Sequence, residues 1–371
     1  MRSSAAASTH PAAAEAATQA FHVEAGDIAG TAIDAVVAGV LALCVRHAGV
    51  MLGSGTILMG GTGEGSLVID GRARQPGLGA ARPRGFTDAR SIPDAARIAA
   101  PLLPHALTLA HAGRGNRTRT ALLRLAVDAA KSIGKVDDAR AESLRAFGRE
   151  GGGFLRAGPI RDALLEASAR SVGGTLTRDD LDALRPDLGQ AKRLDLDARQ
   201  WALAPWSRAL GLNDEASAPE IAGEIAIVAA ADPYGAVAIA SVLVPSMATP
   251  IGDTGLSAPH LARPVLRGVT REAAGAALST PTPIGVAQGR IYESGKSELG
   301  AVDLAFGLGG HGDVELLFDD VARRLSAMGA AVDEVVASKR VGEESDPLGV
   351  AAGILVDVRG HSRALADPRK R

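Results

Sequence analysis

One stretch constrains the fold more than any other: GEIAIVAAADPYGAVAIAS, from Gly223 to Ser241. Two runs composed almost only of Ala, Val and Ile flank a short Asp-Pro-Tyr-Gly segment. β-Branched residues bounded by Pro and Gly are typical of strands joined by a tight turn. Because both runs are nearly free of polar side chains, we predict a buried hairpin at the centre of the fold.

The remaining chain is helical in its first half, mixed in the middle and rich in strands after Ile221. This order favours one layered α+β fold over a doubly wound βαβ fold. Thr31 is predicted to cap the buried second helix, and Thr177 with Asp180 resembles a capping box. Helices are predicted at 11–20, 31–45, 94–112, 117–132, 138–148, 159–171, from 177 to before Pro186, and 314–328.

Composition excludes several classes of partner. The net charge of −2 over 371 residues offers no basic surface for nucleic acid or an acidic membrane. The sequence has neither the apolar core of a signal peptide nor an apolar run of about 20 residues, so we expect a soluble, cytoplasmic protein. Cys44 is the single cysteine and lies in an apolar run, which predicts a buried, inert thiol.

Standard motifs for cofactors and metals do not fit. The glycine-rich stretch from Gly53 to Gly65 lacks the Lys-Ser/Thr pair of a phosphate-binding loop. The eight histidines do not fall at the spacings of metal ligands, and no G-x-S-x-G elbow occurs. We therefore predict no cofactor and no metal.

Six segments match one protein family in the same order along the chain. They are GTAIDAVVAGVLAL, VIDGRARQP, the long stretch from Gly151 to Pro186 that contains GGTLTRDDL, ALSTPTPIGVAQGR, FGLGGHG and the closing GHSRALADPRKR. Together they resemble the γ-glutamyltranspeptidase family of N-terminal-nucleophile (Ntn) hydrolases, which cleave themselves to expose a catalytic threonine. The stretch from Gly151 to Pro186 is the strongest single match.

This resemblance implies a fold and a set of site residues. The fold would be a four-layer αββα sandwich in a single domain, 1–371, in which 1–217 resembles the family's large subunit and 218–371 its small subunit. Arg72, Ser279 and Thr280 match the residues that bind the substrate α-carboxylate in the family. Gly309 and Gly310 match the turn that forms the oxyanion hole. The residues themselves leave alternatives open: a solvated charge for Arg72, and turn chemistry for the others.

The family's nucleophile motif is missing. Anchored on Asp232, the Thr-Thr-His that begins the nucleophile strand corresponds to Ile225, Ala226 and Ile227. No Ser, Thr or Cys lies between Pro219 and Ala240. Self-cleavage needs a hydroxyl or thiol, so the chain is expected to stay unprocessed.

Three hypotheses follow. The preferred one is a catalytically degenerate γ-glutamyltranspeptidase-like protein with a structural or regulatory role in glutathione metabolism, as a homo-oligomer or paired with an active relative. It explains the losses without adding a new site. The second is an active amide hydrolase or transferase with a relocated nucleophile at Ser241, Ser279 or Thr280 and His311 as its base. The third is a module that binds a glutamate-like carboxylate or a γ-glutamyl ligand.

Overall fold

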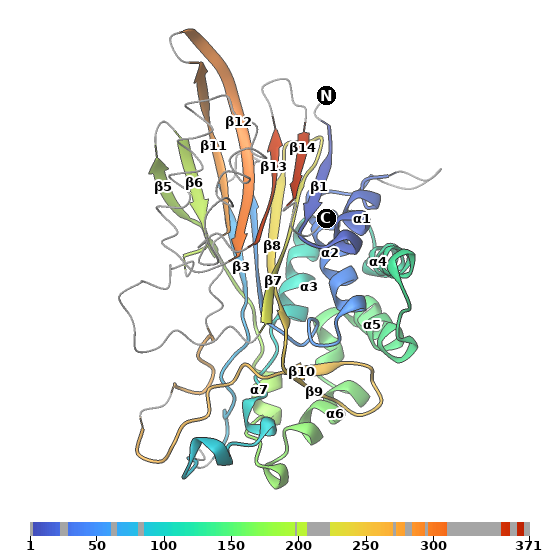
Figure 1. Ribbon diagram of the computed structural model, residues 1–371, viewed down its shortest axis with the longest axis vertical. Coiled ribbons are helices and arrows are strands. Elements are labelled where there is room, and N and C mark those ends of the chain that lie inside the picture. The colour runs from blue at the N-terminus through green and yellow to red at the C-terminus, as the bar shows by residue number, and fades with distance from the viewer. Residues whose placement is uncertain are drawn as a thin grey trace.

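The computed structural model describes residues 3–22, 29–60, 65–80, 85–196, 199–205, 223–269, 272–278, 284–293, 296–309, 350–356 and 362–366. Two six-stranded antiparallel sheets form its centre (Figure 1). The first has the order β1-β7-β8-β2-β3-β4, with bounds Ala5–Ser8, Gly223–Ala231, Val237–Pro245, Gly55–Gly60, Leu67–Gly71 and Asp187–Gln190. The second has the order β14-β13-β12-β11-β6-β5, with bounds Ser362–Ala366, Val350–Val356, Lys296–Gly309, Ile284–Glu293, Arg199–Leu203 and Lys192–Leu196.

The predicted hairpin is confirmed as β7 and β8, which lie side by side inside the first sheet. Their side chains alternate between two buried clusters, because successive residues of a strand point to opposite faces. Ile225, Ile227 and Ala229 pack in the cluster between the two sheets, whereas Ala226 and Val228 join the cluster on the helical face. A hairpin covered on both sides needs apolar residues at every position, which explains its composition.

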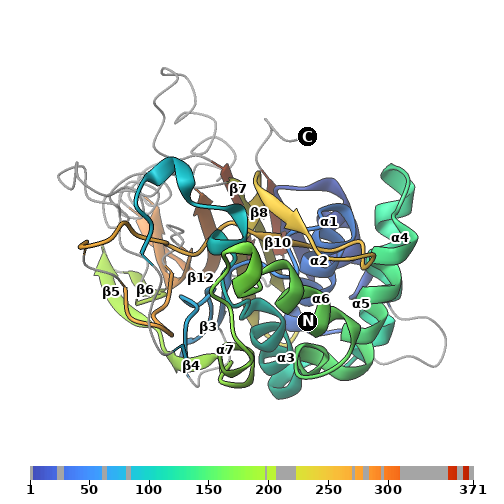
Figure 2. The same cartoon turned by 90° about the horizontal axis from the view of Figure 1, so that it is seen from below.

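Helices cover the outer face of the first sheet. Figure 2 shows α1, α2, α4 and α5 on one side of β7 and β8, and β12, β6 and β5 on the other. The helices are α1 (Pro11–Gln19), α2 (Ala32–Arg46), α3 (Leu103–Arg114), α4 (Arg119–Ile133), α5 (Asp138–Glu150), α6 (Pro159–Ala167) and α7 (Arg178–Asp182).

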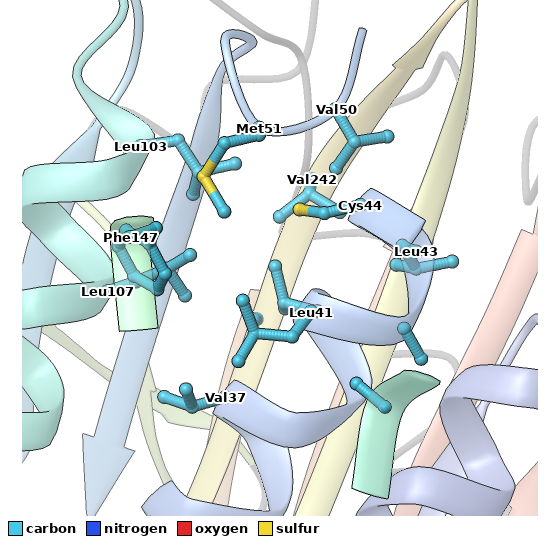
Figure 3. Close-up of a cluster of buried hydrophobic side chains, with 14 of the residues drawn as sticks. Val37, Leu41, Leu43, Cys44, Val50, Met51, Leu103, Leu107, Phe147 and Val242 are labelled. Carbon is cyan, nitrogen blue, oxygen red and sulfur yellow. The ribbon is translucent and has the colours of Figure 1, made fainter. Parts of the chain in front are cut away.

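Helix α2 is the centre of the helical layer. It packs against β7 and β8 on one side and against α1, α3, α4 and α5 on the others. Figure 3 shows Leu41 and Cys44 of α2 in one apolar cluster with Leu107 of α3, Phe147 of α5 and Val242 of β8. The prediction that Cys44 is buried is confirmed, and this complete burial raises the pKa of its thiol.

Both predicted helix caps are confirmed. Thr31 accepts a hydrogen bond from the backbone N–H of Asp34, and the Asp34 carboxylate accepts from the backbone N–H of Thr31. Thr177 and Asp180 form the same reciprocal pair at α7. Such boxes satisfy N–H groups that have no partner within the helix.

One predicted helix begins later than expected. Instead of one helix over 94–112, Asp94–Arg97 forms a 3₁₀ turn and α3 starts only at Leu103. Pro101 is the physical reason, because a proline disfavours helical backbone in the residue before it. The segment predicted over 159–171 is likewise split, since α6 ends at Ala167 and Arg170–Val172 forms a short 3₁₀ turn.

The described layers are therefore helices, a first sheet and a second sheet, and they confirm a layered α+β fold with stacked antiparallel sheets. The fourth, outer helical layer of the predicted sandwich is not established, since the predicted helix at 314–328 lies outside the described residues. The first sheet combines strands from before and after residue 217. None of the described helices has the length and apolarity needed to cross a membrane.

Candidate functional site

Residues 225–227, the head of β7, form an apolar packing surface. The resemblance would put a nucleophile here. Ile225, Ala226 and Ile227 are all buried. Ile225 and Ile227 face the second sheet and share a cluster with Leu58 of β2 and Val68 of β3. These side chains carry no group that could attack a carbonyl or move a proton.

Polarity increases along one row of paired residues that crosses the sheet from Ile227. The register pairs Ile227 with Ser241, Ser241 with Thr56, and Thr56 with Asp70. Ile227 belongs to the apolar cluster that lies between the two sheets. Because residues paired across neighbouring strands lie on the same face, the whole row points towards the second sheet. The Ser241 hydroxyl is buried and has no hydrogen-bond partner in the described part of the chain.

The row ends in a charged cluster that consists of Asp70, Arg72, Arg74 and Asp187. The Arg72 guanidinium donates two hydrogen bonds to the Asp70 carboxylate, from Nε to Oδ1 at 2.9 Å and from Nη2 to Oδ2 at 2.8 Å. The backbone N–H of Arg72 also donates to Oδ1 at 2.9 Å. Arg74 Nη2 lies 3.3 Å from Asp70 Oδ2 and 2.9 Å from Asp187 Oδ2. Forked pairing of this kind holds a guanidinium in one fixed orientation.

The cluster contains two guanidinium groups and two carboxylates, so its formal charge is zero, but its members differ in their exposure to water. The side chain of Arg72 is 13% exposed and that of Arg74 is 16% exposed, while Asp70 is 3% exposed. Asp187, the second carboxylate, is 77% exposed and largely hydrated. Of the two carboxylates in the cluster, only Asp70 is therefore buried together with the guanidinium groups.

Two backbone contacts join the segment of Arg72 and Arg74 to residues 277 and 278, which precede the other predicted carboxylate ligands in the sequence. The N–H of Leu278 donates to the carbonyl of Ala73 at 2.9 Å, and Arg74 forms a bridge with Ala277. Leu278 therefore lies beside Ala73, the residue that follows Arg72. Ser279 and Thr280 lie outside the described residues.

The predicted oxyanion hole is described only at its first residue. Gly309 is the last residue of β12 and pairs with Val350 of β13. Gly310 and His311 lie outside the described residues. Within the described part of the chain, no group of three or more His, Cys, Asp or Glu side chains is arranged to hold a metal ion.

Asp180 has a role that its capping motif did not reveal. Besides capping α7, its carboxylate accepts hydrogen bonds from the backbone N–H groups of Gly77 at 2.9 Å and Leu78 at 2.9 Å. These residues begin the loop that follows Arg72 and Arg74. The segment from Gly151 to Pro186 therefore positions the loop beside the charged cluster.

Asp232 provides a second anchor that the sequence pattern did not reveal. Its carboxylate accepts from the N–H groups of Tyr234 at 2.9 Å and Ala236 at 3.0 Å, which closes the turn between β7 and β8. It also accepts from the N–H of Ala32 at 3.1 Å, in the first turn of α2. The hairpin is thus tied to the central helix. An Asp before Pro at a predicted turn was the available signal.

No protein-family model and no curated protein matches the chain. Among solved structures it is similar to LmbA2991 (TM-score 0.71, 15% identity, covering 100% of this chain and 97% of that one) and to cephalosporin acylase from Bacillus halodurans (TM-score 0.69, 14% identity, 99% and 94%). The fold is that of the Ntn hydrolases. γ-Glutamyltranspeptidase from Pseudomonas nitroreducens is a further neighbour (TM-score 0.43, 20% identity, 52% and 68%). The Ntn fold expected from the sequence resemblance is confirmed.

Proposed function

We propose that this chain is a γ-glutamyltranspeptidase-like protein of the Ntn-hydrolase fold that neither cleaves itself nor transfers γ-glutamyl groups. It would act as a structural or regulatory homologue, alone as a homo-oligomer or together with an active relative. The observation that carries this proposal is the head of β7, where Ile225, Ala226 and Ile227 are buried and apolar.

The chemistry explains why these three residues matter. Self-processing requires a hydroxyl or thiol that attacks the carbonyl before it, and turnover then uses the same group with its new α-amine as base. Hydrocarbon side chains supply neither. Burial between two sheets also leaves Ile225 and Ile227 no access to a substrate.

The intact mass of the purified protein tests this directly. We expect a single species at the full-length mass of 37.6 kDa after prolonged incubation, and no hydrolysis of γ-glutamyl anilides. The matched control is an active γ-glutamyltranspeptidase under the same conditions, which must show two subunits and turnover. Two self-generated fragments from this chain, or anilide hydrolysis above buffer, would contradict the proposal.

A second candidate function, binding of a glutamate-like carboxylate, is favoured by the two mostly buried guanidinium groups of Arg72 and Arg74, which lie side by side at Asp70. Glutamate or a γ-glutamyl amide such as glutathione would then raise the melting temperature. Ligand at 100 times its Kd adds about 2.7 kcal/mol to the free energy of unfolding.

Arg72→Lys sharpens this test. Lys keeps a positive charge beside Asp70 but cannot form the forked pair, so we expect the ligand-induced shift to be lost while the protein still folds. Arg90→Ala, at an exposed arginine of the Ala89–Ser91 turn, is the matched control and keeps the shift. A wild-type melting temperature that does not change with saturating glutamate and glutathione rules out this candidate.

A further inference from the structure

A hydroxyl, an imidazole and a carboxylate meet at the end of the first sheet where β7 begins. They lie on and beside a two-stranded ladder formed by β9 (Ala248–Pro250) and β10 (Ser257–Pro259). This ladder follows β8 closely, and Pro245 at the end of β8 pairs with Gly223 at the start of β7. Figure 1 shows β9 and β10 at the lower end of the sheet.

The three groups are Thr249, His260 and Asp94. Thr249 Oγ1 lies 2.8 Å from His260 Nε2, at hydrogen-bond distance. His260 Nδ1 lies 3.8 Å from Asp94 Oδ1 on the other side of the ring. Nδ1 is buried and has no hydrogen-bond partner in the described part of the chain.

The backbone holds the two segments in place. Ile98 and His260 form a bridge, and the N–H of Ala262 donates to the carbonyl of Arg97 at 2.8 Å. The side chain of His260 is only 6% exposed, whereas that of Asp94 is 66% exposed at the start of its 3₁₀ turn. The imidazole is therefore buried, whereas the carboxylate beside it is exposed to water.

The surrounding charges decide where the imidazole proton resides. Asp94 is the carboxylate nearest to Nδ1, and its negative charge favours the proton on that nitrogen. In this tautomer Nε2 accepts a hydrogen bond from the Thr249 hydroxyl, although the 2.8 Å distance alone fits either direction. The pKa of His260 is lowered, chiefly by burial; Asp94 acts in the opposite direction and Arg97 lowers it slightly further.

We propose that Thr249 is a nucleophile for the hydrolysis of small apolar esters, with His260 as its general base and Asp94 as a positioning residue. The surface beside Thr249 suits an apolar acyl group, because Met247 is 54% exposed and Pro250 is also exposed. This site shares no residue with the head of β7, and the proposal does not rest on the function proposed above.

The reaction balances with water as the only co-reactant. Nε2 takes the Thr249 proton while Oγ1 attacks the ester carbonyl carbon, and the alcohol then leaves with that proton as its C–O bond breaks. Nε2 next takes a proton from water, whose oxygen attacks the acyl-threonine. The carboxylic acid leaves, and the proton returns to Oγ1.

Hydrolysis of p-nitrophenyl acetate by the full-length protein tests the proposal. We expect turnover above buffer and an acetylated intermediate that maps to Thr249 by mass spectrometry after rapid acid quench. Thr249→Val and His260→Gln should each lower kcat by about 100-fold or more, which is the usual size of a general-base effect. Thr249→Ser keeps the hydroxyl and should retain activity.

Two variants guard against a purely structural explanation. Asp94→Asn should lower kcat with KM unchanged while circular dichroism shows the same folded fraction as in wild type, because an unfolded fraction would by itself lower the apparent kcat. Ser246→Ala removes an exposed hydroxyl near Thr249 and should leave the rate as in wild type. The proposal is overturned if wild type does not exceed buffer, if Thr249→Val, folded by circular dichroism, matches wild type, or if the acetyl group maps to another residue.

Discussion

The head of β7 and the end of β3 lie in one sheet and face the same neighbouring sheet, yet their chemistry differs completely. The row from Ile227 through Ser241 and Thr56 to Asp70 connects them. β7 lies between β1 and β8, and it is covered by helices on one face and by the second sheet on the other. β3 is one strand from the edge, where Asp187 of β4 reaches water.

This comparison shows where the fold tolerates charge. An ion in the middle of the sheet would lose its hydration without gaining a partner, at a large cost in free energy. Near the edge, Arg72 and Arg74 share Asp70 and keep partial contact with water. Charged side chains therefore lie near the edge of the sheet, and its centre is apolar.

The largest expected effect comes from removing the shared carboxylate. Asp70→Ala removes the buried carboxylate that pairs with both Arg72 and Arg74, so we expect the free energy of unfolding to fall by about 3–5 kcal/mol. Chemical denaturation followed by circular dichroism measures the change.

Asp187→Ala is the matched control for this prediction. It removes a carboxylate from the same cluster, but one that is hydrated, so the expected loss is at most about 1 kcal/mol. Equal losses for the two variants would contradict the contrast drawn between centre and edge.

The smallest expected effect lies midway along the row, at Ser241. Its buried hydroxyl lacks a partner in the described part of the chain, so Ser241→Ala should leave the free energy of unfolding unchanged or raise it by up to about 1 kcal/mol. The same denaturation experiment applies.

Ser8→Ala provides the contrast on the other side of β7. The Ser8 hydroxyl donates to the carbonyl of Ile227 at 2.8 Å, and its loss should cost about 1 kcal/mol. If Ser241→Ala instead lowers the free energy of unfolding as much as Ser8→Ala does, the Ser241 hydroxyl makes a stabilising hydrogen bond and the prediction is wrong.

Local patterns were sufficient for many elements. Helix caps at Thr31 and Thr177, the buried α2 and the β7–β8 hairpin all follow from residues near one another in the sequence. The late start of α3 could also have been read from Pro101. The prediction of one helix over 94–112 was wrong at its start, where Pro101 separates the 3₁₀ turn from α3.

Hydrogen bonds between residues far apart in the sequence could not be predicted from local patterns. The carboxylate of Asp180 holds Gly77, about 100 positions earlier, and Asp232 holds Ala32. Arg72 was identified as a carboxylate-binding residue, but its forked pair with the chain's own Asp70 depends on the side-chain directions at the end of β3.

The sequence by itself determined that a central hairpin is apolar and that a hydroxyl or thiol is missing where the Ntn nucleophile would begin, since both are properties of residue identity. Only the tertiary structure decided that Ile227 and Asp70 belong to one row, and that Thr249 lies at hydrogen-bond distance from His260. Strand register and sheet stacking set these neighbours, and both depend on how distant segments bury their apolar faces together.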